Sequence, residues 1–149
     1  MHGVWIYSQI WVILVGYWFT YMNYTDDKVK KIMVVDDEDD LIFLLQTLLD
    51  QMGFKVSGFT DALLALQAFK AGTYDLAILD IRLPGLDGFE LCERLEKIDH
   101  SLKVCFFTAS EFYQKAEQRS VMINEHHIIR KPISNEDLLK QVQEVLESK

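Results

Sequence analysis

The chain has few of the residues that mark disulfide scaffolds, thiolate metal sites and nucleic-acid surfaces. Its two cysteines, Cys92 and Cys105, lie in apolar patterns without Cys-x-x-Cys spacing, which is typical of small core residues in a reduced compartment. Acids outnumber Lys and Arg by 23 to 15, a net charge of −8, whereas nucleic-acid binding needs clustered Lys and Arg. We therefore expect no nucleic-acid partner. A length of 149 residues allows one ordinary domain with a small extension.

Charge is absent from the first segment of the chain. Residues 1–24 contain no Lys, Arg, Asp or Glu, although they hold all three tryptophans and four of the six tyrosines. As a helix, residues 4–24 would be about 31 Å long, close to the roughly 30 Å of bilayer hydrocarbon. Lysines follow directly, so the positive-inside rule would place the rest of the chain in the cytoplasm. The sequence therefore predicts an apolar N-terminal helix over 1–24 that anchors the chain to the inner face of the cell membrane, then a linker at 25–29.

Two other interpretations of this first segment stay open. A secretory signal peptide is disfavoured, because no basic region begins the segment and no small-residue cleavage site ends it. Alternatively the segment is not normally translated, because Met22 could serve as the start and would leave a complete globular domain behind it.

Short, largely aliphatic runs end at polar side chains of kinds that α/β proteins use in their sites. The runs at 32–35, 76–79, 104–107 and 127–130 are followed by Asp36-Asp37, Asp80, Thr108 and Lys131. Buried strands deliver such side chains to the carboxyl edge of a sheet. A further strand is predicted over 55–59, and helical spacing predicts helices over about 40–52, 61–71, 89–95, 111–122 and 134–146. This alternation favours a parallel sheet with helices on both faces.

The order and character of these strand ends resemble the receiver domain of two-component response regulators. The resemblance covers Lys30 to about Leu146, and its motifs are Val35-Asp36-Asp37-Glu38, Leu79-Asp80, Leu83-Pro84-Gly85-Leu86-Asp87-Gly88, Thr108-Ala109 and Lys131-Pro132. It implies a receiver domain at 30–149 with the flavodoxin-like, doubly wound five-stranded sheet of order 2-1-3-4-5. It also implies a stand-alone regulator similar to those of chemotaxis.

The resemblance implies a role for each polar strand end. Asp80 would be the phosphoacceptor, phosphorylated by a histidine kinase or phosphotransfer protein. Lys131 would neutralise the phosphoryl oxygens, and Thr108 would hydrogen-bond one of them. The implied ligands of Mg²⁺ are Asp36 (mainly through water), Asp37, Asp80 and the backbone carbonyl of Arg82. The Lys131–Pro132 peptide is expected to be cis.

The output implied by the resemblance is phosphorylation-dependent binding of another protein, and no separate enzymatic substrate is expected. Three positions depart from the family pattern. Ile128 stands where a switch Tyr or Phe is frequent, Asn124-Glu125 replaces Gly-Ala, and Arg82 lies where it can influence water access to Asp80.

Two other functions stay in view beside this one. The first is a constitutive membrane-tethered docking or scaffold module, whose partner binding would be indifferent to phosphorylation of Asp80. The second is a phosphatase of the haloacid-dehalogenase type, which also uses an aspartyl nucleophile. That family requires Asp-x-Asp, and here Arg82 occupies the second position, so the phosphatase is disfavoured.

Fractionation of native cells into membrane and soluble pools, with the amino terminus mapped, tests the predicted anchor. An anchor places the full-length chain in the membrane pool. A chain that begins at Met22 and stays in the soluble pool would contradict the prediction.

Overall fold

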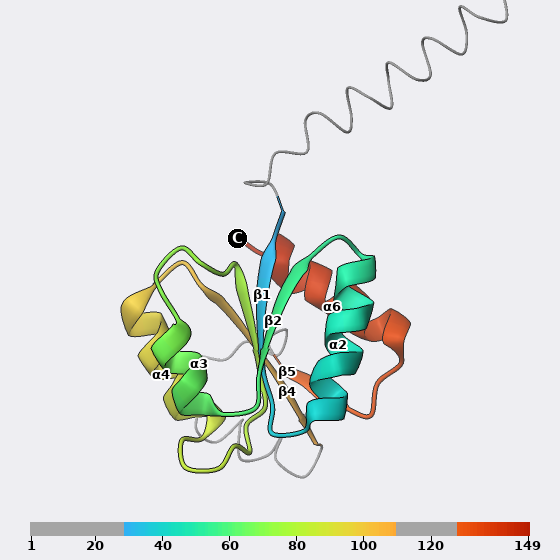
Figure 1. Cartoon of the computed structure of the whole chain (residues 1–149). Helices are drawn as coiled ribbons and strands as arrows, with labels where there is room; N and C mark the ends of the chain where they lie inside the picture. The colour runs from blue at the N-terminus through green and yellow to red at the C-terminus, as the bar shows by residue number, and fades with distance from the viewer. Residues whose placement is uncertain (1–28, 110–127) are drawn as a thin grey trace, which may run out of the picture.

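The computed structural model describes residues 29–109 and 128–149, and within them five parallel strands form one sheet (Figure 1). The strand order is β2-β1-β3-β4-β5, which confirms the predicted α/β fold class and order. The strands are β1 (Lys31–Val35), β2 (Lys55–Phe59), β3 (Leu76–Leu79), β4 (Lys103–Ala109) and β5 (Ile128–Lys131).

Helices cover both faces of the sheet (Figure 1). On one face lie α3 (Ala62–Ala68) and α4 (Gly88–Ile98), and on the other lie α2 (Asp39–Gln51) and α6 (Asn135–Glu147). Each pair of helices closes its own hydrophobic core against the sheet. The doubly wound arrangement therefore agrees with the prediction from alternating strands and helices.

Alternate strand residues feed these two cores. Ile32 and Val34 of β1 pack toward α2 and α6, whereas Met33 and Val35 pack toward α3 and α4. All residues of β3 are at most 1% exposed. A strand buried on both faces has no position for a polar side chain, which explains why these segments are continuous aliphatic runs.

Three of the helices have an N-cap residue whose side chain accepts a hydrogen bond from the first turn. Asp87 accepts from the Glu90 amide (2.9 Å) while the Glu90 carboxylate accepts from the Asp87 amide (3.3 Å), a reciprocal capping box at the start of α4. Asp61 caps α3 and Ser134 caps α6. These caps fix where each loop ends, and so fix the loops that follow the carboxyl ends of the strands.

Polar groups at the amino edge of the sheet satisfy one another. Asp75 accepts from the Lys30 ammonium (2.7 Å) and from the Lys31 amide (2.9 Å), which ties β1 to the start of β3. The Lys103 ammonium donates to the carbonyls of Leu146 (2.7 Å) and Ser148 at the end of α6. This edge is thus held by structural contacts.

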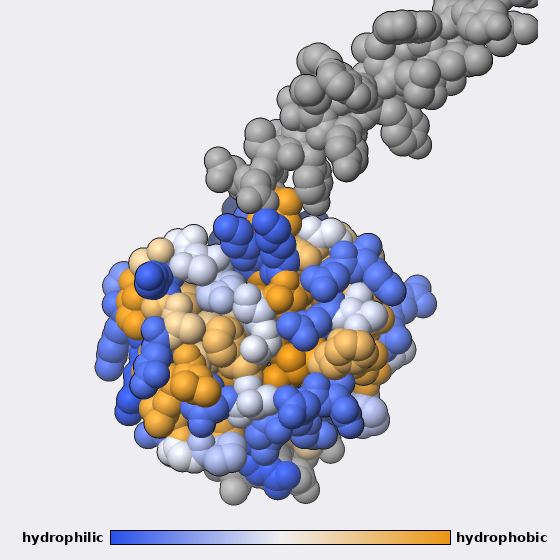
Figure 2. Space-filling view, viewed as in Figure 1, coloured by the Kyte–Doolittle hydropathy of each residue, from blue (hydrophilic) through white to orange (hydrophobic). Residues whose placement is uncertain are grey.

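Helices α2 and α3 pack on the sheet through narrow inner stripes, leaving large apolar side chains outside. Phe43 of α2 is 72% exposed, and Leu63 and Leu64 of α3 are 51% and 59% exposed. Hydrophobic residues gather over α3 in the view along the β2 edge (Figure 2). These side chains add little to either core.

Two carboxyl-terminal strand boundaries differ from the prediction. Thr108 lies inside β4, because Ala109 still pairs with Lys131 of β5. Lys131 likewise lies within its strand. The apolar segment 1–24, most of the linker, the helix predicted over 111–122 and Asn124-Glu125 lie outside the described residues. In the described part of the chain, no helix is long and apolar enough to cross a bilayer.

Candidate functional site

Strand register brings Asp36 and Asp80 together at the carboxyl edge. Val35 of β1 is paired with Leu79 of β3, so the next residues, Asp36 and Asp80, leave neighbouring strands about 4.8 Å apart. The Asp80 amide donates to the Val35 carbonyl (2.9 Å), which holds the end of β3 against β1. Both acids are nearly buried, at 2% and 8% exposure. Two like charges are therefore confined to one small volume.

Lys131, which lies on the edge strand β5, supplies the opposite charge. Its ammonium lies 2.9 Å from Asp36 Oδ2, 3.9 Å from Glu38 Oε1 and 4.0 Å from Asp80 Oδ2. The structure thus brings three of the predicted side chains, Asp36, Asp80 and Lys131, into one charge cluster. The Lys131–Pro132 peptide is cis, which confirms the expectation from the family resemblance.

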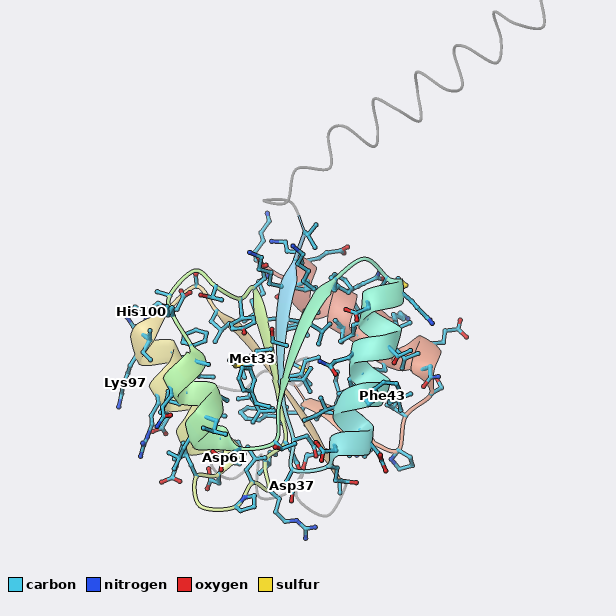
Figure 3. All side chains as sticks on the ribbon, in the orientation of Figure 1. Met33, Asp37, Phe43, Asp61, Lys97 and His100 are labelled. Carbon is cyan, nitrogen blue, oxygen red and sulfur yellow. The ribbon has the colours of Figure 1, made fainter. Side chains whose placement is uncertain are left out.

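The oxygens of Asp36 are already engaged by protein donors. Oδ1 accepts from the Glu38 amide (2.9 Å) and Oδ2 accepts from Lys131. Asp37 is exposed and lies at the end of the molecule toward which the strands run (Figure 3). Among the described residues, ligand oxygens of Asp36, Asp37 and Glu38 lie within 4.8 Å of one another. This all-oxygen set suits a hard divalent cation.

Asp80 combines burial with lightly engaged oxygens. Burial raises its pKa, Lys131 opposes this effect, and the charges of Asp36 and Asp37 add to it. The Arg82 amide lies 3.3 Å from Oδ1, a long hydrogen bond, and the Arg82 side chain is exposed. A bound cation would relieve the repulsion among these acids. The site therefore fits both a cation and a reactive carboxylate.

Thr108 has a buried hydroxyl whose oxygen lacks a hydrogen-bond partner within the described residues. Leaving such a group unpaired costs about 1–3 kcal/mol, and native proteins rarely retain one without a reason. Thr108 follows Phe107 on β4 and pairs with Arg130 of β5, so it stands at the same edge as the acids. Its position fits a ligand oxygen that is supplied from outside the protein.

Gly88, which directly precedes the helix predicted over 89–95, also supports Asp80. Its amide donates to the Ile81 carbonyl (2.9 Å). A Cβ at Gly88 would lie 2.2 Å from the Asp80 carbonyl oxygen and 2.9 Å from Ile81 Cα. The start of α4 can therefore touch the backbone of Asp80 only because residue 88 has no side chain.

Ile128, at the position where a switch aromatic is frequent, is 8% exposed and belongs to the same core cluster as Phe106. A buried aliphatic side chain has no polar tip that could exchange between the core and the solvent. An aromatic rotation is therefore not available at this position.

Comparison with known proteins decides the family. Residues 32–143 match the response regulator receiver domain. The chain belongs to this family. The five-stranded order agrees with that of a receiver domain of two-component signalling.

Relatives of this receiver domain include longer regulators. The regulatory protein VanRc of Enterococcus gallinarum is 40% identical over 80 residues, 54% of this chain and 34% of the relative. The alkaline phosphatase synthesis transcriptional regulatory protein PhoP of Bacillus subtilis is 38% identical over 82 residues, 55% of this chain and 34% of the relative. The chain thus matches about a third of the length of either relative.

A solved structure also resembles this receiver domain closely. The response regulator TrrA of Thermotoga maritima, in complex with Mg²⁺-BeF, is 28% identical with a TM-score of 0.67. The match covers 78% of this chain and 99% of that chain.

Gly88→Ala should lower the free energy of unfolding by about 2 kcal/mol, because the new methyl group would overlap backbone that cannot move aside. At an ordinary helical position the same change would stabilise the protein by up to about 1 kcal/mol, so a loss is diagnostic. Urea denaturation measures the difference.

Gly58→Ala is the matched control for this substitution. Its Cβ would also meet an atom at 2.2 Å, but that atom is the Ile42 Cγ2 methyl, a side-chain atom of α2 that is not part of the Asp80 backbone. Amide resonances of Asp80 and Ile81 should shift in Gly88→Ala and not in Gly58→Ala. If these resonances are unshifted in both variants, Gly88 does not support the backbone of Asp80.

Proposed function

We propose that this receiver domain accepts a phosphoryl group on Asp80 from a histidine kinase or phosphotransfer protein and signals by a change in protein binding. The observation that carries the proposal is the charge cluster at the carboxyl edge. Asp80 is nearly buried there, its oxygens are lightly engaged, and its Oδ2 lies 4.0 Å from the Lys131 ammonium. An exposed acid at a helix start would have none of these features.

The acids suit Mg²⁺ as the companion of phosphorylation. Asp37, Asp80 and the backbone carbonyl of Arg82 are the proposed direct ligands. Asp36 would act through water, because both of its oxygens already accept from Glu38 and Lys131. When bound, Mg²⁺ would neutralise charge on the phosphoryl oxygens. The Mg²⁺-BeF complex of the related TrrA supports this assignment.

The proposed transfer uses the Asp80 carboxylate as nucleophile. One carboxylate oxygen attacks phosphorus in line, an oxygen–phosphorus bond forms, and the bond from phosphorus to the donor's imidazole nitrogen breaks. Lys131 is held 2.9 Å from Asp36 and can exchange that partner for a phosphoryl oxygen without leaving the edge. The residues thus orient the reacting groups and balance the charge.

Thr108 would link phosphorylation of Asp80 to a structural change in β4 and β5. Its buried hydroxyl, which has no partner among the described residues, can donate to a phosphoryl oxygen once that group arrives. The pairing of Thr108 with Arg130 would pass the resulting shift of β4 to β5. We propose the second half of the domain as the output surface for an as yet unidentified protein.

A constitutive docking module is the second candidate function. It is favoured by Ile128, a buried aliphatic residue at the position that often carries a rotating aromatic. Partner affinity separates the two functions. Regulated binding predicts a difference of about 1–3 kcal/mol between phosphorylated and unphosphorylated protein, and constitutive binding predicts none.

Mg²⁺ should stabilise the wild-type protein against thermal unfolding, because binding to the folded state alone adds about 2.7 kcal/mol at roughly 100 times the dissociation constant. Asp37→Asn should remove most of that gain. Asp39→Asn is the matched control, since it changes an exposed acid in the first turn of α2 outside the acid cluster. If Mg²⁺ stabilises both variants equally, Asp37 is not a ligand of the ion.

Incubation with Mg²⁺ and a small-molecule phosphodonor should add one phosphoryl group to the wild-type protein, measured by intact mass. Asp80→Asn should abolish the addition. Asp87→Asn should retain it, because asparagine also caps a helix and α4 would still begin at the same place. Labelling that survives Asp80→Asn would show that another residue is the phosphoacceptor.

A further inference from the structure

Lys131 has to cross the sheet to reach its partner. The lysine belongs to β5 and Asp36 follows β1, and β3 and β4 lie between these strands. Nevertheless the Lys131 ammonium lies 2.9 Å from Asp36. The side chain must therefore extend over the end of β4, the strand next to its own. A long, flexible side chain in such an extended position needs something to hold it there.

The ring of Phe107 lies along this path. The Lys131 ammonium is 5.0 Å from the centre of the ring, within the range of a cation–π contact. Strand register explains the contact. Phe107 pairs with Ile129, and Ile129 and Lys131 point to the same face because side chains alternate along a strand. The ring is therefore a diagonal neighbour of the lysine on the face that α2 and α6 cover.

The ring is well placed to act as a fixed platform. Phe107 is 5% exposed and is packed in the core beside buried residues of α2 and α6. The carboxylates of Asp36, Glu38 and Asp80 surround the same ammonium at 2.9, 3.9 and 4.0 Å. The π face attracts the cation without carrying a net charge, so it leaves the ammonium's charge available to the acids.

We propose that Phe107 is a positioning residue for Lys131. Its ring keeps the ammonium over the end of β4, so that the lysine stays within reach of Asp80 when it exchanges Asp36 for a phosphoryl oxygen. A cation–π contact has little directional demand compared with a hydrogen bond, so it can persist through that exchange. The kinetic part of this inference rests on the proposed function, and the geometric part does not.

The neighbouring Phe106 provides a matched control on the same strand. It is 2% exposed and packs on the opposite face, where its ring centre lies 4.9 Å from that of Phe89. Phe106→Leu and Phe107→Leu thus remove the same number of atoms from equally buried positions. Only Phe107→Leu removes a ring that faces Lys131.

Nuclear magnetic resonance of the lysine side chain in the full chain tests the geometry without any phosphorylation. The Lys131 ε-methylene protons should show an upfield ring-current shift in the wild-type protein and in Phe106→Leu. Phe107→Leu should abolish that shift. A Lys131 signal that is unchanged by Phe107→Leu would overturn the proposal, whether or not the protein is ever phosphorylated.

Phosphoryl incorporation from a small-molecule donor tests the consequence. Phe107→Leu should slow it about 3- to 10-fold, the range expected when a cation–π contact at a largely buried site is lost. Phe106→Leu should leave the rate close to that of the wild type. In a Lys131→Met background, Phe107→Leu should have no further effect, because the ring would have no ammonium to hold.

A merely structural role for Phe107 predicts a different pattern. The slowing would then be equal in the Lys131 and Lys131→Met backgrounds, and this outcome would overturn the proposal.

A site-specifically fluorinated phenylalanine at position 107 covers the case in which Phe107→Leu does not fold. It keeps the shape of the ring but weakens its negative face, so it should slow incorporation, and an unchanged rate would also overturn the proposal. If the wild-type protein takes up no phosphoryl group, the proposed function fails, and the ring-current shift still decides the position of Lys131.

Discussion

At the carboxyl edge of the sheet, two nearly buried carboxylates lie beside one ammonium group, and their repulsion determines what the site can bind. Two like charges at 4 Å repel by about 4 kcal/mol at an effective dielectric constant of 20. Asp36 and Asp80 are 2% and 8% exposed, so neither can relax into water, and Lys131 is their shared compensating charge. One ammonium cannot neutralise two buried acids and the exposed Asp37 beside them. A divalent cation would complete the charge balance.

The two edges of the sheet use their polar groups differently. At the amino edge, Asp75 and Lys103 find partners within the protein and hold strands and α6 in place. At the carboxyl edge, the Thr108 hydroxyl lacks a partner within the described residues. Asp80 accepts a long hydrogen bond from the Arg82 amide and lies 4.0 Å from the Lys131 ammonium. Stability is therefore supplied at one edge, which allows incompletely satisfied groups to persist at the other.

The sequence predicts the fold class and the polar strand ends because both depend on local pattern, whereas the strand order was implied by the family resemblance. Aliphatic runs that stop at Asp36, Asp80 and Lys131 mark buried strands and their edge, and parallel pairing then brings the ends together. The supporting contacts could not be predicted in this way. Gly88 touches the Asp80 backbone and Phe107 faces Lys131 only because the folded sheet places those segments together. The end of β4 was missed for a similar reason, since Ala109 stays in the strand through its pairing with β5.

Borohydride reduction of the phosphorylated protein, followed by peptide mass mapping, tests the central claim most directly. Reduction converts an aspartyl phosphate to homoserine and so marks the acid that carried the phosphoryl group. If the buried acid beside Lys131 is the acceptor, homoserine will be found at position 80, with Asp36 and Asp37 unmodified. Homoserine at position 36 or 37, or a phosphoryl group that reduction cannot trap on any aspartate, would contradict the account.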